Sequence, residues 1–113
     1  ISLLLHRLLE IISPVKKVWN GGNTSAWRQD IIDVNGFDES LNYGAEDVEL
    51  GQRLKNNGIS GRHIRYTAPL LHMEHPRGYV DADQIKRNKA YVKEVKSKKL
   101  VWATDGIVKD KIC

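Results

Sequence analysis

Apolar residues recur at every third or fourth position along three stretches of the chain, which is the spacing of one buried face of an α-helix. The first stretch, residues 1–13, predicts an amphipathic helix that ends before Pro14. The second predicts a helix that begins near Ala45 and ends at an Asn-Gly pair, residues 57–58. The third predicts a long helix over residues 81–99.

The sequence also predicts how two of these helices are capped and oriented. Asp81 opens the third helix, so we interpret the Asp-Ala-Asp sequence at residues 81–83 as a helix cap. In the second helix, apolar side chains are expected inside and polar ones outside. The expected inner residues are Val48, Leu50 and Leu54, and the expected outer residues are Gln52, Arg53 and Lys55.

A shorter helix and two strand-like segments complete the pattern. A short helix is predicted over residues 27–34, with Thr24 or Ser25 as its cap and a left-handed turn at residues 35–36. Two segments have the composition of β-strands, residues 15–20 and 59–66. Because helices and strands alternate along the chain, the predicted fold class is α/β, or mixed α+β.

Length and composition bound the kind of protein. A chain of 113 residues forms one domain at most and buries a modest core. Its single cysteine, Cys113, excludes an internal disulfide framework and a cysteine metal site. The apolar run at residues 1–13 is too short and too charged to span a bilayer, and it lacks a signal-peptide cleavage site. We therefore expect a cytoplasmic protein, or one at the inner face of the membrane.

The net charge of +4 raises the question of a polyanionic partner. Much of the excess lies in residues 86–99, where an acid and apolar residues are interleaved at helical spacing. That arrangement favours a solvated helix face over a nucleic-acid-binding surface. An anionic membrane surface is a third use for the same charge.

Three acids lie within four residues, at Glu46, Asp47 and Glu49, where the second helix is predicted to begin. Acids in a first turn are stabilised by the helix dipole by about 0.3–1 kcal/mol each, which is an adequate structural explanation. The residues before them suggest more. Gly44 leaves space for a ligand to approach the backbone, and Tyr43 offers a flat face on which a sugar can stack. A carboxylate here can act as a general base towards a sugar hydroxyl.

The segment GGNTSAWRQDIIDVNGFDESLNYGAEDVELGQRLKNNG resembles the carboxyl-terminal half of a GT-A type glycosyltransferase domain. It is most similar to β-1,4-galactosyltransferases, chondroitin polymerases and bacterial family-two enzymes. Those proteins carry a Gly-rich turn, an Asn-Gly-Phe loop, an aromatic-Gly-Gly-Glu-Asp motif and a helix that ends in Arg-Leu. Two positions depart from the galactosyltransferases, Ala45 in place of glycine and Tyr43 in place of tryptophan.

We divide the single domain into an amphipathic helix at residues 1–13, a segment at 19–80 that carries the acceptor, catalytic-base and metal residues, and a basic carboxyl-terminal helix and tail at 81–113. The resemblance implies roles for residues of the middle segment. Asp47 would be the general base, and Glu46 would bind the acceptor or donor sugar. Substrate-binding roles fall on Gly22, Asn23, Tyr43, Gly44 and Arg77. The implied reaction transfers a hexose from a nucleotide-sugar, such as a UDP-sugar, to a glycan or glycolipid hydroxyl with inversion.

His72 and His75 lie where the same families place a metal-binding histidine. A lone histidine is more often a structural hydrogen-bonding group, and Pro76 argues against a helix that would bring the two rings together. The resemblance nevertheless implies Mn²⁺, or Mg²⁺, bridging the diphosphate of the donor. Imidazole suits manganese better than magnesium.

A nucleotide-binding half is not expected within these residues, because too few of them precede Gly21 to form a βαβ unit. We therefore expect a fragment that is inactive alone, whose partner is the amino-terminal half of the same chain. Its apolar helix and an exposed sheet edge are expected to allow self-association. Two other functions remain open: a non-catalytic carbohydrate-binding or interaction domain, and a small basic nucleic-acid-binding module.

Overall fold

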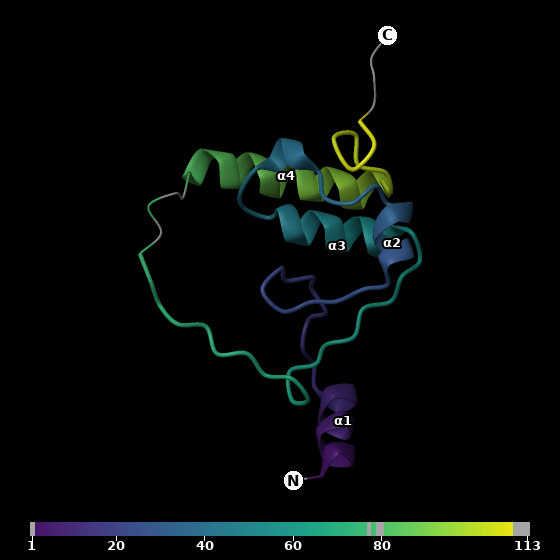
Figure 1. The fold of residues 1–113 in the computed structure, drawn as a ribbon, viewed down its shortest axis with the longest axis vertical. Helices are drawn as coiled ribbons and strands as arrows, with labels where there is room; N and C mark the ends of the chain where they lie inside the picture. The colour runs from purple at the N-terminus through teal and green to yellow at the C-terminus, as the bar shows by residue number, and fades with distance from the viewer. Residues whose placement is uncertain (1, 77, 79–80, 110–113) are drawn as a thin grey trace.

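The structure, a computed structural model, describes residues 2–76, 78 and 81–109. Within these residues the elements follow one another in the order α1 Leu3–Ile12, α2 Arg28–Asp33, the 3₁₀ turn η1 Glu39–Leu41, α3 Glu46–Asn56 and α4 Ala82–Lys98. Figure 1 shows α3 and α4 side by side, with α2 near the carboxyl-terminal end of α3. Helix α1 lies apart from this group, at the other end of the molecule.

The described residues contain no β-strand, so the expected α/β class is not confirmed for them. The strand predictions for residues 15–20 and 59–66 are wrong there, because both segments are loop. A strand needs a neighbour that accepts and donates its backbone hydrogen bonds, and neither segment meets one. One isolated bridge joins Asp105 to Lys109, and the described part of the chain has no sheet edge of the expected kind.

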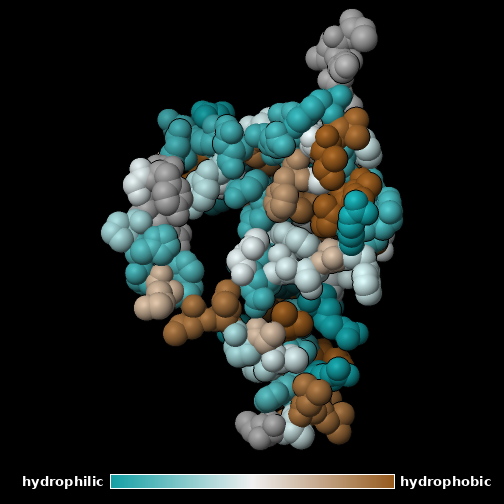
Figure 2. Space-filling view, viewed as in Figure 1, coloured by the Kyte–Doolittle hydropathy of each residue, from teal (hydrophilic) through white to brown (hydrophobic). Residues whose placement is uncertain are grey.

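Helix α1, Leu3–Ile12, lies within the predicted residues 1–13 and leaves most of its apolar side chains in solvent. The Ser2 hydroxyl accepts a hydrogen bond from the backbone of Leu5, and the chain leaves the helix at Ser13, before the proline. Exposed apolar residues on α1 are Leu3, Leu4, Leu5, Leu8, Ile11 and Ile12. They appear as hydrophobic surface at the α1 end in Figure 2. Nowhere in the described chain is a helix long and apolar enough to cross a membrane.

The core lies between α2, α3 and the segment after α4. Val34, Leu50 and Leu54 form its fully buried centre, as the sequence predicts for the two leucines. Partly buried hydrophobic residues pack around it: Trp19, Ile31, Ile59 and Val101. Packing against Trp19 is close, because a Cβ on Gly51 of α3 would collide with the tryptophan side chain.

Arg53 is buried at 1% exposure, so its predicted position on the outer face of α3 is wrong. Its Nε donates to both carboxylate oxygens of Glu49 at 2.5 and 2.7 Å. Its two terminal nitrogens donate to the carbonyls of Val34 and Gly36 at 2.5 and 2.7 Å. Burial raises the pKa of the Glu49 carboxyl, against the opposing effect of these hydrogen bonds. The Glu49–Arg53 pair on α3 therefore holds the end of α2 against α3.

Local signals at the helix ends are mostly confirmed. Asn35 and Gly36 both have positive φ, 66° and 69°, and end α2 as predicted. The Asp81 side chain accepts from two backbone N–H groups at the start of α4, which confirms the helix cap. The cap predicted at Thr24 or Ser25 is wrong, because α2 begins after Trp27 with no side-chain cap.

The segment after α4 is anchored on the Asn35 side chain. The Asn35 amide nitrogen donates to the carbonyls of Ala103 and Val108 at 2.6 and 2.8 Å, and its oxygen accepts from the Val108 backbone at 2.7 Å. A Cβ on Gly106 would meet the Asn35 carbonyl, so this approach requires glycine. One asparagine therefore joins the end of α2 to the segment beyond α4.

Candidate active site

The amino-terminal end of α3 presents the two acids. Gly44 and Ala45 have φ of 95° and 65°, and these left-handed residues turn the chain sharply into the helix. Ala45 occupies the cap position and offers no side-chain hydrogen bond. Glu46 and Asp47 therefore stand in the first turn beside exposed N–H groups, where the helix dipole stabilises negative charge.

Asp47 connects this helix to the glycine-rich turn. Its Oδ2 accepts a hydrogen bond from the backbone N–H of Gly21 at 2.9 Å, and its Oδ1 accepts from the N–H of Val48 at 2.8 Å. The Asp47 side chain is half-buried. An ionised carboxylate has about four lone-pair sites, so each oxygen retains capacity for a further donor.

Glu46 carries a polar atom without a protein partner. Its Oε2 is buried and makes no hydrogen bond to any described residue. Buried polar atoms in folded proteins are nearly always satisfied, so this oxygen has capacity for a donor from outside the described chain. A hydroxyl group is one such donor.

Gly22 and Asn23 lie in the turn that Asp47 contacts. The Gly22 backbone donates to the side chain of Asn20 at 3.0 Å, and the Asn23 amide donates to the carbonyl of Ala68 at 3.1 Å. Asn23 thus ties the turn to the loop that leads to the histidines. The described contacts place both residues beside the site and do not join either one to Glu46.

Asn88 of α4 fixes the loop that carries Tyr43 and Gly44. It is 2% exposed, and its amide nitrogen lies 2.7, 3.1 and 2.6 Å from the carbonyls of Leu41, Tyr43 and Gly44. A Cβ on Gly44 would collide with the side chain of Ile85, also on α4. Sequence reasoning missed Asn88, although an asparagine on the inner face of a helix is a signal that backbone carbonyls lie opposite.

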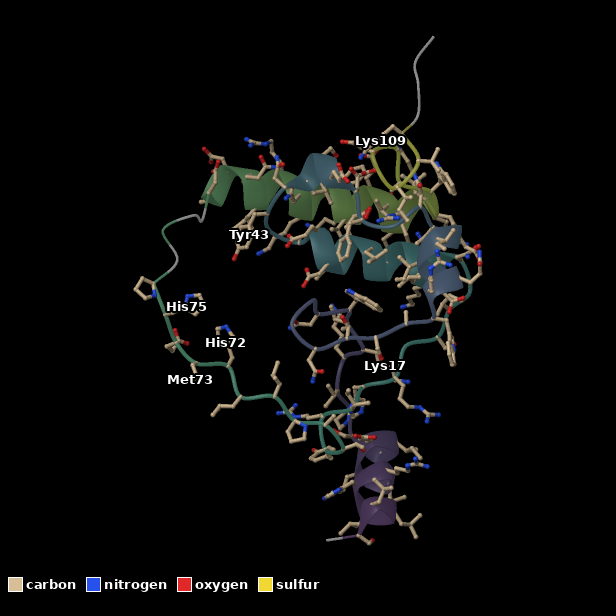
Figure 3. All side chains as sticks on the ribbon, in the orientation of Figure 1. Lys17, Tyr43, His72, Met73, His75 and Lys109 are labelled. Carbon is tan, nitrogen blue, oxygen red and sulfur yellow. The ribbon has the colours of Figure 1, made fainter. Side chains whose placement is uncertain are left out.

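His72 and His75 lie close together on an exposed loop. Their ring centroids are 5.7 Å apart, and Figure 3 shows both rings on the same stretch of chain. The His75 Nδ1 lies 3.1 Å from the carbonyl of Pro76, so it carries the proton and leaves Nε2 as a ligand atom. Metal–nitrogen bonds are about 2 Å long, so the two rings share one ion only if a nitrogen of each ring faces the gap between them.

A complete metal-binding set is not found among the described residues. No group of three or more histidine, cysteine, aspartate or glutamate side chains is placed to hold an ion there. The two histidines fit part of such a site and would need further ligands. Arg77, the predicted phosphate-binding residue, lies outside the described residues.

Comparison with known families decides the relationship. Residues 7–76, which include both acids, the glycine-rich turn and the two histidines, match the family described as the N-terminal domain of galactosyltransferase. The chain belongs to this galactosyltransferase family. The family description names an amino-terminal domain, whereas the motifs resemble a carboxyl-terminal half. The assignment of these residues to the carboxyl-terminal half of the domain therefore stays a prediction.

A bacterial relative is consistent with this assignment. The galactosyltransferase-family chain is 38% identical over 71 residues to YfnE of Bacillus subtilis (strain 168), described as an uncharacterized glycosyltransferase. The match covers 62% of this chain and 18% of the relative. No solved structure matches the chain at a significant level.

Proposed function

We propose that these residues form the acceptor-binding and catalytic-base part of a metal-dependent, inverting hexosyltransferase with a GT-A fold. The donor would be a nucleotide-sugar such as a UDP-sugar, and the acceptor a hydroxyl of a glycan or glycolipid. The nucleotide-binding half would come from other residues of the same protein, which we place in the cytoplasm or at the inner face of the membrane.

The observation that carries this proposal is the position of Asp47. One of its oxygens is held by the Gly21 backbone at 2.9 Å, so the carboxylate has a fixed orientation at the end of α3. A general base must accept a hydrogen bond from the hydroxyl that it deprotonates, and Asp47 retains lone pairs for one. The hydroxyl proton would pass to Asp47 while the hydroxyl oxygen forms the new bond to the anomeric carbon of the donor sugar. The bond from that carbon to the diphosphate would break, and the nucleoside diphosphate would leave.

Neighbouring side chains would position the acceptor and the donor. Glu46, with its unpartnered buried oxygen, would accept a second sugar hydroxyl. Tyr43 would stack on a sugar ring, and Gly22 would keep side chains out of the approach. The expected open space beside Gly44 is filled by Ile85 of α4, so we assign Gly44 no direct contact with substrate. His72 and His75 would hold Mn²⁺ or Mg²⁺, which would neutralise the leaving diphosphate.

The proposal is tested by Asp47→Asn in the full-length protein. We expect transfer to fall by about 10²–10⁴-fold, the usual contribution of a general base, while circular dichroism stays unchanged. Asp83→Asn is the matched control, because Asp83 is an exposed acid in the first turn of α4. Normal turnover by the Asp47 variant would contradict the proposal and favour a non-catalytic carbohydrate-binding domain.

The metal role has a separate test. Titrating the full chain with Mn²⁺ in the presence of UDP should broaden the NMR signals of His72 and His75. The imidazole of His6, which belongs to neither proposed site, serves as the internal control and should be less affected. Equal broadening of the His6, His72 and His75 rings would contradict a metal site at the pair.

A further inference from the structure

A second group of cationic side chains lines a pocket beside α1. Helix α1 lies at the opposite end of the molecule from α4 (Figure 1). A pocket of about 340 Å³ is formed there by α1 and two loops. Its lining includes Arg7 and Glu10 of α1 together with Lys17, Arg62 and His63. The proposed transfer reaction assigns no role to any of these residues.

The charge of this pocket is unbalanced. Arg7, Lys17 and Arg62 bring three positive charges, and none of them forms an ion pair in the described chain. The one carboxylate in the lining, Glu10, already accepts a hydrogen bond from the Thr67 backbone at 2.7 Å. The three positive charges exceed the one negative charge of Glu10, and an excess of positive charge favours an anionic ligand.

Tertiary contacts hold the cationic segments together. A Cβ on Gly61 would lie 3.7 Å from the Cβ of Lys17, so the backbone next to Arg62 is adjacent to Lys17. The Glu10–Thr67 hydrogen bond ties α1 to the same loop across 57 residues. The three charges therefore converge because of the fold, and not because they are neighbours in sequence.

His63 adds an unsatisfied polar group to the lining. Both of its ring nitrogens are buried, and neither has a hydrogen-bond partner among the described residues. Neutral imidazole has one donor and one acceptor nitrogen, so at least one N–H lacks an acceptor. An anion in the pocket would supply that acceptor.

We propose that this pocket binds a phosphoryl group, as a phosphate ester or diphosphate carried by a larger molecule. Guanidinium and ammonium groups are the side chains that proteins use for phosphate oxygens, and Arg62 and Arg7 can each form two parallel bonds. The proposal is independent of the transfer site, because none of the pocket residues contributes to that site.

The carrier of the phosphoryl group is either a lipid or a soluble molecule. Leu4, Arg7 and Ile11 are spaced i, i+3, i+7 and share one face of α1. Leu4 and Ile11 are 78% and 77% exposed, so an acyl or prenyl chain attached to the phosphate would find apolar surface beside it. A soluble phosphate ester would use only the cationic groups.

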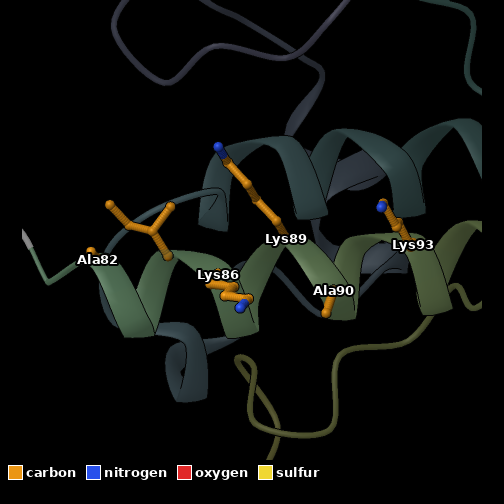
Figure 4. A pocket seen from close by; sticks show the side chains of 6 residues that line it. Ala82, Lys86, Lys89, Ala90 and Lys93 are labelled. Atoms are coloured by element: carbon orange, nitrogen blue, oxygen red, sulfur yellow. The ribbon is translucent and has the colours of Figure 1, made fainter.

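The hollow on α4 provides a matched comparison. Figure 4 shows it lined by Lys86, Lys89 and Lys93, which all come from one helix. Charge alone would attract an anion there equally well, whereas the α1 pocket adds arginines and a buried histidine from separate segments. Comparing the two separates a built site from general positive charge.

The experiment measures binding of the full chain to inorganic pyrophosphate, and to phosphatidylcholine vesicles with and without phosphatidic acid. The double variant Lys17→Gln and Arg62→Gln should lose about tenfold or more in affinity, because two charge-assisted hydrogen bonds disappear. The double variant Lys89→Gln and Lys93→Gln removes the same charge and should retain binding. All four side chains are exposed, so circular dichroism should be unchanged.

The two probes, pyrophosphate and phosphatidic acid vesicles, identify the molecule that carries the phosphoryl group. Binding to phosphatidic acid vesicles alone, weakened by Leu4→Gln, indicates a lipid phosphate, and binding to pyrophosphate indicates that a soluble phosphate suffices. Arg62→Lys keeps the charge but loses the two parallel bonds of the guanidinium, so its loss of affinity should lie between those of the parent and Arg62→Gln. Equal loss in both double variants, or no binding to either probe, would overturn the proposal.

Discussion

The Asp47 carboxylate accepts a hydrogen bond from the backbone N–H of Gly21, with 2.9 Å between oxygen and nitrogen, although the two residues are 26 positions apart in sequence. This bond joins the first turn of α3 to the glycine-rich turn, two motifs that the family resemblance treats separately. It also selects one orientation of the Asp47 side chain before any substrate arrives.

Gly21→Pro removes the N–H that holds Asp47, whereas Gly21→Ala keeps it. A Cβ at residue 21 would lie 3.5 Å from the Asp47 Cβ, which is an ordinary contact. Under the proposed function, we expect kcat of the full-length protein to fall by about 10- to 100-fold in the proline variant, because the proposed base is no longer oriented. The alanine variant should stay close to the parent in the same assay. Equal kcat values for the proline and alanine variants would show that transfer does not need the hydrogen bond from Gly21 to Asp47.

Arg53→Ala should destabilise the fold by about 3–5 kcal/mol, because it leaves the Glu49 carboxylate buried without a partner. It also removes the donors for the carbonyls of Val34 and Gly36. Urea unfolding followed by circular dichroism measures the difference. Lys98→Ala is the control, since it removes an exposed pair with Glu94 and should cost less than about 1 kcal/mol. A similarly small loss of unfolding free energy in Arg53→Ala would contradict a structural role for the buried Glu49–Arg53 pair.

Glu10 should make stability depend on acid pH. Hydrogen bonds from the Thr67 side chain, and further ones from the backbone, lower the pKa of the Glu10 carboxyl despite its burial. The folded chain then binds fewer protons than the unfolded one, so this stabilisation is present above the unfolded pKa of about 4.3 and is lost as pH falls through the lower folded value.

The test for Glu10 compares the parent with Glu10→Gln by urea unfolding between neutral and acidic pH. The parent's stability advantage should shrink as pH falls below about 4.3, and the comparison cancels groups that both chains share. An advantage that is constant with pH would show that the carboxylate charge contributes nothing.

Gly44→Ala should be costlier than Gly58→Ala, although both glycines have left-handed φ of 95° and 85°. Each variant forces a side chain into that conformation, at about 1–2 kcal/mol. Only residue 44 would also collide with Ile85, since no atom lies within 4 Å of a Cβ at residue 58. Overpacking adds about 1–3 kcal/mol, which thermal unfolding can resolve. Equal losses of stability in the two variants would mean that Ile85 shifts to accommodate the new side chain without destabilising the fold.

The sequence predicts the features of this fold that depend on neighbouring residues. The end of α2 at Asn35, the stop of α3 and the cap of α4 at Asp81 all follow from short-range hydrogen bonds and backbone preferences, and these predictions are confirmed. The position of Glu46 and Asp47 at the start of α3 is also predicted from the sequence. It depends only on the turn at Gly44 and Ala45 and on the helix that follows.

Features that depend on distant partners were not predicted. Arg53 is charged and therefore expected in solvent, and its burial requires carbonyls of Val34 and Gly36 that no local pattern reveals. Asn88 is likewise explained only by the loop before α3. The strand-like segment at residues 59–66 has the right composition and no described neighbour to pair with, because propensity alone does not make a strand.

The bonds made by Asn35 also set an order of events during synthesis. The Asn35 amide cannot bond to the Val108 carbonyl until Val108, 73 residues later in the chain, has been synthesised. At ribosomal rates of about 5–20 residues per second, that interval lasts about 4–15 seconds. During this time the end of α2 has its turn but not its anchor, and the apolar centre beneath it is open to chaperones. Translation speed between residues 35 and 108 therefore sets how long the end of α2 lacks this anchor.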